Sequence, residues 1–172
     1  MKKTDLKKIT LTAIFAALIA VATMFISIPT GKGYIHVGDS MVYLAGCLLG
    51  PYAAIAAALG GALSDIIKGY LVWAFPTAII KACNSVPFII ASSIYIKQKK
   101  QHKIIHLSTL LMTLVSGVIT VVGYFFAGWI LHGFAYGLSG ILGNTIQAVG
   151  SAIVFILLGC ALDAVKIQKY LK

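Results

Sequence analysis

Apolar residues run along nearly the whole chain and are interrupted only at short intervals. The apolar segments occupy residues 9–28, 38–50, 51–69, 75–96, 104–131 and 138–165. A helix needs about 20 apolar residues to cross a bilayer, and a helix satisfies its own backbone hydrogen bonds in lipid. The pattern therefore predicts an all-α polytopic membrane protein. We expect a bundle of six transmembrane helices that forms a single membrane domain over residues 1–172.

The apolar stretch from 38 to 69 is too long for one crossing. Gly50-Pro51 offers a break, because proline suits the first turn of a new helix and disfavours helix in the residue before it. The resulting helix over 38–50 would be short, at roughly 20 Å, and would barely cross the membrane alone.

Composition agrees with a membrane protein and limits the classes of molecule that the chain can bind. Hydrophobic residues make up 60% of the chain and charged residues 10%, which leaves too few polar side chains to cover a soluble domain. All fourteen basic residues are Lys, so the chain lacks the Arg side chains that read bases through paired hydrogen bonds. We expect a lipid bilayer around the chain and no nucleic acid bound to it.

The lysines predict the orientation in the membrane. Eleven of the fourteen lie in three clusters, at 2–8, 97–103 and 166–172. Cytoplasmic loops carry an excess of Lys and Arg. Six crossings put the three clusters on one side, whereas three crossings before residue 97 would put the middle cluster outside. We therefore expect a multi-pass protein of the cell membrane with cytoplasmic N- and C-termini.

Polar side chains gather toward the outer ends of the predicted helices. Thr77, Lys81 and Asn84 are spaced i, i+4, i+7, and Asn144 and Gln147 are spaced i, i+3, so each set lies on one helix face. Polar faces inside a bundle must meet each other, water or a ligand. An external pocket for a small polar, aromatic molecule is predicted. The candidate substrate-binding residues are Lys81, Asn84, Asn144, Gln147, Asp65, Lys68, His36, Asp39, Tyr124 and Trp129.

Several of these residues also have a purely structural interpretation. Lys81 could extend its ammonium to the outer headgroups, and Asp39 could cap the helix that it precedes. Asp65 and Lys68, three residues apart, could form a local ion pair. Trp129 could belong to the belt of aromatic residues at the membrane surface, and His36 could be a surface loop residue.

Motifs for catalysis and for energy coupling are missing from the sequence. The Gly31–Gly33 segment lacks the spacing and the Ser or Thr of a Walker A motif, and there is neither a Glu nor a metal-ligand cluster. We expect no enzymatic activity, no metal and no cofactor. Either another chain supplies the energy for transport, or this chain is a self-sufficient, gradient-driven carrier of small molecules.

The first predicted helix carries two pairs of alanines spaced four residues apart, Ala13/Ala17 and Ala16/Ala20. Small residues at this spacing let helix backbones approach closely in lipid. The two pairs lie on neighbouring stripes of the helix. They could pack against helices of this chain or against a partner membrane protein.

Four motifs, in this order, resemble the substrate-binding S component of an energy-coupling factor (ECF) vitamin transporter. They are Tyr34-Ile-His-Val-Gly-Asp-Ser40, Leu48-Leu-Gly-Pro51, Gly61-Ala-Leu-Ser-Asp-Ile-Ile-Lys-Gly69 and Pro76-Thr-Ala-Ile-Ile-Lys81. The resemblance covers nearly the whole chain, although the last two predicted helices match only in pattern. It is greatest to the pyridoxine or hydroxymethylpyrimidine branch, and the riboflavin and pantothenate branches stay open.

This resemblance implies a high-affinity vitamin-binding subunit of an ATP-driven importer. Such a subunit captures its vitamin from outside and works with a membrane T component and two cytoplasmic ATPase subunits. The resemblance assigns contact with the T component to the alanines of the first helix, Ala13, Ala16, Ala17 and Ala20. It also explains why the chain lacks an ATPase motif of its own.

Overall fold

The computed structural model describes residues 3–29, 34–99 and 103–167. Several lysines of the topology argument, Lys2, Lys32, Lys100, Lys169 and Lys172, lie outside the described residues, as does the Gly31–Gly33 segment.

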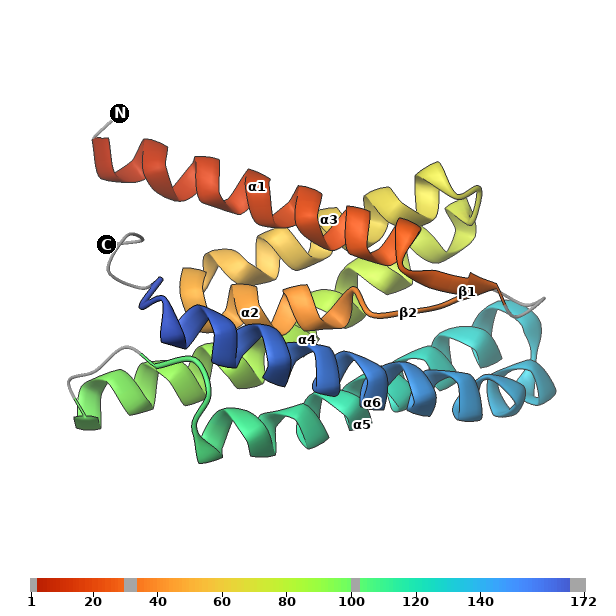
Figure 1. Ribbon diagram of the computed structural model, residues 1–172. Coiled ribbons are helices and arrows are strands. Elements are labelled where there is room, and N and C mark those ends of the chain that lie inside the picture. The colour runs from red at the N-terminus through yellow and green to blue at the C-terminus, as the bar shows by residue number, and fades with distance from the viewer. Residues whose placement is uncertain (1–2, 30–33, 100–102, 168–172) are drawn as a thin grey trace.

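Six α-helices and one short β-hairpin make up the described chain (Figure 1). The helices are α1 (Lys3–Phe25), α2 (Asp39–Leu49), α3 (Tyr52–Ile67), α4 (Leu71–Lys99), α5 (Leu107–His132) and α6 (Phe134–Ala164). The hairpin joins α1 to α2 and consists of β1 (Ser27–Pro29) and β2 (Tyr34–His36). The six predicted helical segments are therefore confirmed as helices, with shifted ends.

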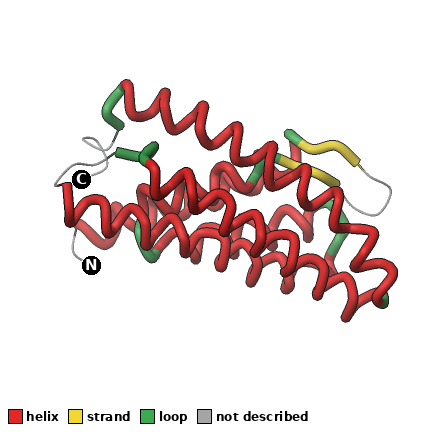
Figure 2. The backbone as a smooth tube through the Cα atoms, turned by 90° about the horizontal axis from the view of Figure 1, so that it is seen from below, coloured by secondary structure: helices red, strands yellow, loops and turns green. Residues whose placement is uncertain are grey.

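The hairpin corrects the predicted end of the first helix. Residues 27 and 28 were expected in a helix over 9–28, but α1 ends at Phe25 and Ile28 pairs with Ile35 in an antiparallel ladder. The apolar count could not separate the two forms, because Ile26 and Ile28 continue the hydrophobic run while Pro29 stops a helix. Figure 2 shows the hairpin at one end of the helical bundle.

The break between α2 and α3 falls where the sequence predicts it. Gly50 has φ +57° and ψ −138°, a conformation that glycine adopts with little strain, and Pro51 precedes the first turn of α3. The start of α4 lies four residues earlier than expected. That helix begins at Leu71 and continues through Pro76 and Pro87.

Four helices of the described chain are long and apolar enough to cross a membrane: Leu6–Phe25, Leu71–Gln98, Leu107–His132 and Phe134–Ala164. The other two, α2 with 11 residues and α3 with 16, extend only about 16 and 24 Å. A polytopic all-α membrane protein is thus supported. The expected six crossings are not confirmed, because α2 and α3 are shorter than a hydrocarbon core of about 30 Å.

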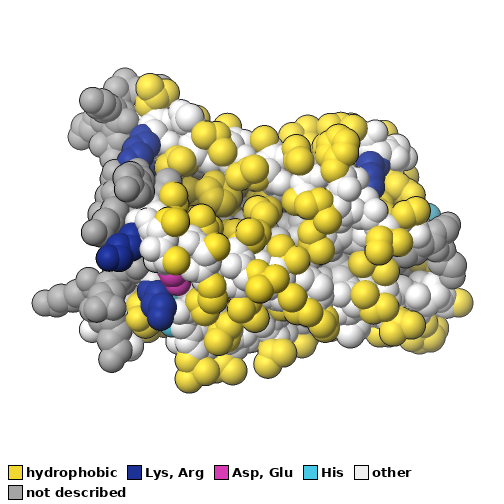
Figure 3. Space-filling model, in the orientation of Figure 1, with side chains coloured by type: hydrophobic (Ala, Val, Ile, Leu, Met, Phe, Trp, Pro, Cys, Tyr) yellow, Lys and Arg dark blue, Asp and Glu magenta, His cyan; other side chains and the backbone are white. Residues whose placement is uncertain are grey.

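Helix α2 lies at the centre of the bundle, in contact with α1, α3, α4 and α6. Its Tyr43 is fully buried and stacks on Phe88, with ring centroids 4.4 Å apart, and meets the edge of Phe155 at 5.7 Å. These rings fix α2 between α4 and α6. The outer surface is mainly apolar, unlike that of a soluble protein. On the face drawn in Figure 3, hydrophobic side chains cover the middle, and the Lys side chains lie toward the two ends.

The ends of the bundle differ. Helix α1 begins and α6 ends at the same end, and the hairpin lies at the opposite end (Figure 1). This arrangement brings β2, the end of α3 and the start of α4 close to the end of α5 and the start of α6.

Candidate functional site

A cavity of about 340 Å³ lies at the hairpin end. Strand β2 and every helix except α2 contribute residues to its wall. Its lining residues are Thr23, Tyr34, Ile35, His36, Asp65, Tyr70, Trp73, Thr77, Tyr124, Tyr136, Gly137, Ser139, Gly140, Leu142, Gly143, Asn144, Ile146 and Gln147. The volume falls in the range of pockets that enclose small organic ligands.

Aromatic rings form much of the wall. Trp73 of α4 lies 6.1 Å from Tyr124 of α5 and 6.1 Å from Tyr136 of α6, measured between ring centroids. On the hairpin side, Tyr34 lies 5.5 Å from both Tyr70 and His36. A flat heteroaromatic ring can stack on such surfaces.

The hairpin is fastened to the end of α3. The Tyr34 hydroxyl donates a hydrogen bond of 2.6 Å to Asp65 Oδ1. The Lys68 ammonium lies 3.8 Å from the centre of the Tyr34 ring and donates to Ser27 Oγ at 2.6 Å. Burial, and then the bond to Asp65, raise the pKa of Tyr34, so its hydroxyl stays protonated and remains a donor. These contacts hold β1 and β2 over the cavity.

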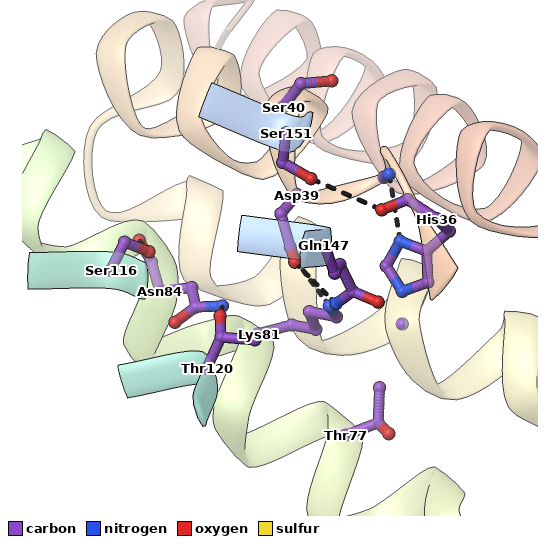
Figure 4. Close-up of polar contacts among 12 residues, drawn as sticks. His36, Asp39, Ser40, Thr77, Lys81, Asn84, Ser116, Thr120, Gln147 and Ser151 are labelled. Atoms are coloured by element: carbon purple, nitrogen blue, oxygen red, sulfur yellow. Dashed lines mark hydrogen bonds and ion pairs between the residues drawn. The ribbon is translucent and has the colours of Figure 1, made fainter. Parts of the chain in front are cut away.

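An ion pair lies behind the cavity, fully buried. Lys81 Nζ of α4 contacts Asp39 Oδ1 of α2 at 2.5 Å, and neither side chain is exposed. Gln147 of α6 donates its amide N–H to the other oxygen, Asp39 Oδ2, at 3.0 Å (Figure 4). Charges inside a membrane bundle need such partners, because lipid offers none. Three helices are thereby joined by one polar cluster.

Gly61 of α3 makes room for this cluster. A Cβ at that position would come within 2.8 Å of Lys81 Cγ and 3.0 Å of Thr77 Cγ2. The missing side chain lets Lys81 pass between α3 and α4 toward Asp39. The sequence singled out Lys81 but gave no reason to connect it with Gly61.

A second polar group lies deeper in the bundle. Asn84 donates its side-chain N–H to Thr120 Oγ1 at 2.8 Å, and Ser116 Oγ donates to the Asn84 backbone carbonyl at 3.1 Å. All three residues are fully buried. This group connects α4 to α5.

His36 is buried at the start of the loop into α2. Its Nδ1 accepts the Gly38 backbone N–H at 3.0 Å, and its backbone carbonyl accepts Ser151 Oγ at 3.4 Å. Desolvation, and then the charge of Lys81, lower the pKa of His36 to about 3. The ring is therefore neutral at physiological pH. Because Nδ1 is an acceptor, we assign the proton to Nε2.

Five of the ten predicted site residues line the cavity: His36, Asp65, Tyr124, Asn144 and Gln147. Asp39, Lys81 and Asn84 lie behind its wall, and Lys68 and Trp129 are also outside its lining. Three structural interpretations raised by the sequence fail. Lys81 is fully buried and does not extend to the headgroups, the cap position of α2 belongs to Gly38, and His36 is buried instead of lying on the surface. Lys68 bonds to Ser27 instead of forming the predicted local pair.

The predicted set missed most of the aromatic wall. Tyr34, Tyr70, Trp73 and Tyr136 line the cavity. Tyr34 belongs to the hairpin, Tyr70 directly precedes α4, and Trp73 and Tyr136 lie in the first turns of α4 and α6. Three short segments between the predicted apolar stretches hold these residues, and that position was the available signal. The sequence alone could not bring those segments together.

The alanine stripes of α1 separate into two environments. Ala16 and Ala20 are buried, and the Ala16 backbone lies against Gly60 of α3. Ala13 and Ala17 are exposed on the outer face. Close packing inside the chain therefore uses one stripe and leaves the other open.

A helical membrane bundle with an aromatic-walled cavity defines the class of a membrane-embedded binding protein. Residues 3–164 match the model of the family described as "ECF-type riboflavin transporter, S component". The chain belongs to this family: it is a substrate-binding transporter subunit and not an enzyme. It is also 32% identical over 139 residues to a Pyrococcus woesei protein described as "Uncharacterized protein in gap 3'region", covering 79% of this chain and 88% of the relative.

Proposed function

We propose that this chain captures a small, water-soluble heteroaromatic vitamin in the cavity at the hairpin end. The cavity carries the proposal, because aromatic rings surround a few polar groups from Asp65, Asn144 and Gln147. Such a wall suits a flat ring with polar substituents. Delivery to the inside requires a membrane T component and two ATPase subunits, as the family resemblance implies.

The proposed setting is the cell membrane, with six crossings and with both termini in the cytoplasm. The common end of α1 and α6 and the apolar middle of the surface support it. The lysine clusters support it as well, since they fall at the same end under this topology. The short α2 would cross as a central helix enclosed by its neighbours, which are longer and meet the lipid.

Pyridoxine and hydroxymethylpyrimidine are the substrates that the resemblance of the sequence favours, and riboflavin is the substrate that the family description names. All three present a flat heteroaromatic ring with hydroxyl or amine donors. The lysine predicted as a substrate ligand, Lys81, is paired with Asp39, so we assign polar recognition to Asp65, Asn144 and Gln147.

Native mass spectrometry of the purified chain tests the proposal. We expect a co-purified mass equal to one of these vitamins, and displacement of it by the same vitamin added in excess. An Asn144→Ala variant should retain less ligand, because it removes an amide from the wall. A protein that carries and binds none of the three vitamins would contradict the proposal.

A further inference from the structure

Asp65 presents an unused hydrogen-bond acceptor at the cavity. The residue is only 5% exposed and lines the cavity wall. Its Oδ1 accepts the Tyr34 hydroxyl at 2.6 Å, while its Oδ2 has no hydrogen-bond partner among the described residues. A buried carboxylate oxygen without a donor is costly, and a bound molecule that donates to it would remove that cost.

Gln147 presents a second acceptor. Its amide nitrogen donates to Asp39 Oδ2, and Asp39 Oδ1 is bound to Lys81. A carboxylate without a proton cannot donate, so this contact fixes which way the amide is turned. The remaining polar atom of Gln147 is its carbonyl oxygen, which points away from Asp39 in Figure 4. The ion pair behind the wall thus makes Gln147 an acceptor toward the cavity.

The cations near the cavity are engaged elsewhere. Lys81 is fully buried and neutralised by Asp39, and it is not part of the lining. The Lys68 ammonium lies against the Tyr34 ring and bonds to Ser27, and it is also outside the lining. His36 does line the cavity, but its ring is neutral. Among the residues that the structure describes, no lysine lines the wall, whereas one carboxylate does.

We propose that the cavity selects an uncharged or cationic heteroaromatic ligand that donates hydrogen bonds to Asp65 and Gln147, and that it rejects carboxylates and phosphate esters. The selection rests on the proposed function, because it specifies the ligand of the same cavity. An anion next to Asp65 would meet a like charge on a carboxylate that is itself only 5% exposed, and such a juxtaposition disfavours binding. Riboflavin, pyridoxine and hydroxymethylpyrimidine satisfy this rule. Pantothenate, which carries a carboxylate, does not.

Binding titrations of the full purified chain in detergent test the rule with matched ligands. One pair is riboflavin and riboflavin 5′-phosphate. The other is pyridoxine and 4-pyridoxic acid, in which a carboxylate replaces one hydroxymethyl group. Pantothenate is titrated alongside. For whichever pair contains the vitamin that the chain binds, we expect the uncharged ligand to have a Kd at least about tenfold lower than its anionic partner. We expect pantothenate not to bind.

The Asp65→Asn variant tests whether Asp65 is the residue that disfavours anionic ligands. It keeps the size of the side chain and an acceptor for Tyr34, but it removes the negative charge. The ratio of the anion's Kd to the uncharged ligand's Kd should fall by about tenfold or more in this variant, because the anion binds more tightly than it does to the wild type. Thermal unfolding shows whether the variant is folded. If it is not, the Kd ratios of the two ligand pairs measured on the wild type decide the proposal.

The outcomes separate this inference from the proposed function. Equal affinity of the wild type for both members of a pair would overturn the inference while the vitamin-binding function stands. A Kd ratio that is unchanged in folded Asp65→Asn would also overturn it. If none of the uncharged vitamins binds, the proposed function fails and this inference fails with it.

Discussion

The ammonium of Lys81 is neutralised inside the bundle, where Asp39 of α2 pairs with it and Gln147 of α6 binds the same carboxylate. Its partner Asp39 lies 42 positions earlier in the chain, and the pair is fully buried. Asp39 also holds Gln147, whose carbonyl is then left for the cavity. The charged pair is thus connected to a residue of the cavity wall.

Removing one member of the pair should be more damaging than removing both charges. Lys81→Met leaves Asp39 buried without its cation, and we expect a loss of about 3–5 kcal/mol in the free energy of unfolding. The double variant Lys81→Met/Asp39→Asn should recover much of that loss, because no unpaired charge remains. Thermal and denaturant unfolding in detergent measure both. A single variant as stable as the wild type would contradict a buried pair.

The buried ring of His36 predicts a pH dependence. Its pKa falls from an ordinary 6.5 to about 3 in the folded protein, so between these values the unfolded chain binds more protons than the folded one. The free energy of unfolding should therefore decrease as pH falls from about 6.5 toward 3. His36→Asn, which retains an acceptor for the Gly38 N–H, should show a shallower decrease over pH 4.5–7. Identical slopes would show that His36 does not titrate in this way.

Residue types and spacing predicted much of the polar set but not the part each residue takes. Asn144, Gln147 and Asp65 were recognised because polar groups inside apolar helices need partners, and they do line the cavity. The sequence could not tell whether Lys81 meets a ligand or Asp39, since that depends on how α2 and α4 pack. The aromatic residues between the predicted helices could not be assigned to the cavity for the same reason.

At the scale of elements, helices pack closely where their facing residues are small. Gly60 and Gly61 lie on α3, where Gly60 meets α1 and Gly61 meets Lys81 of α4. Two neighbouring glycines thus let one helix approach two others. The alternation of buried and exposed alanines on α1 follows from the same packing.

Paired substitutions test the role of Gly61. Gly61→Ala places a methyl 2.8 Å from Lys81 Cγ, so we expect destabilisation by about 1–3 kcal/mol and weaker ligand binding. Gly150→Ala is the matched control on α6, because a Cβ there meets no atom within 4 Å. That change should be neutral or stabilising by up to about 1 kcal/mol, since alanine favours helix. Unfolding experiments on both variants compare them directly, and equal effects would contradict a special role for Gly61.

The open alanine stripe on α1 is the proposed contact with the T component. Ala17→Trp should leave ligand binding by the isolated chain unchanged and prevent co-purification with the partner subunits, because a bulky ring blocks close helix packing. Leu157→Trp introduces the same ring on α6, where the native side chain is 65% exposed, and should allow assembly. Normal assembly of Ala17→Trp would place the contact elsewhere.

The helices could be predicted more securely than the hairpin. A break at Gly50-Pro51 follows from the backbone chemistry of both residues, and α3 begins directly after it. The two strands have three residues each, too few for alternation to stand out within an apolar run. Their pairing is stabilised by contacts of Tyr34 with the distant Asp65 and Lys68, which no local pattern reveals.

At the scale of the whole molecule, the two ends of the bundle differ in kind. One end gathers the hairpin, the aromatic wall and the cavity, and the other holds the start of α1 and the end of α6. The sequence predicted this asymmetry from the depth of polar residues in each helix. The number of crossings could not be fixed by length, because α2 and α3 are shorter than a usual membrane span.

A chain of this family that binds a vitamin but lacks an ATPase motif should be unable to transport alone. Uptake of a radiolabelled vitamin into proteoliposomes tests this claim most directly, with the chain reconstituted alone or together with the T component and the two ATPase subunits. We predict uptake only in the full complex, only with ATP on the cytoplasmic side, and unaffected by dissipating ion gradients. Uptake by the chain alone, driven by an ion gradient, would contradict the account and identify a self-sufficient carrier.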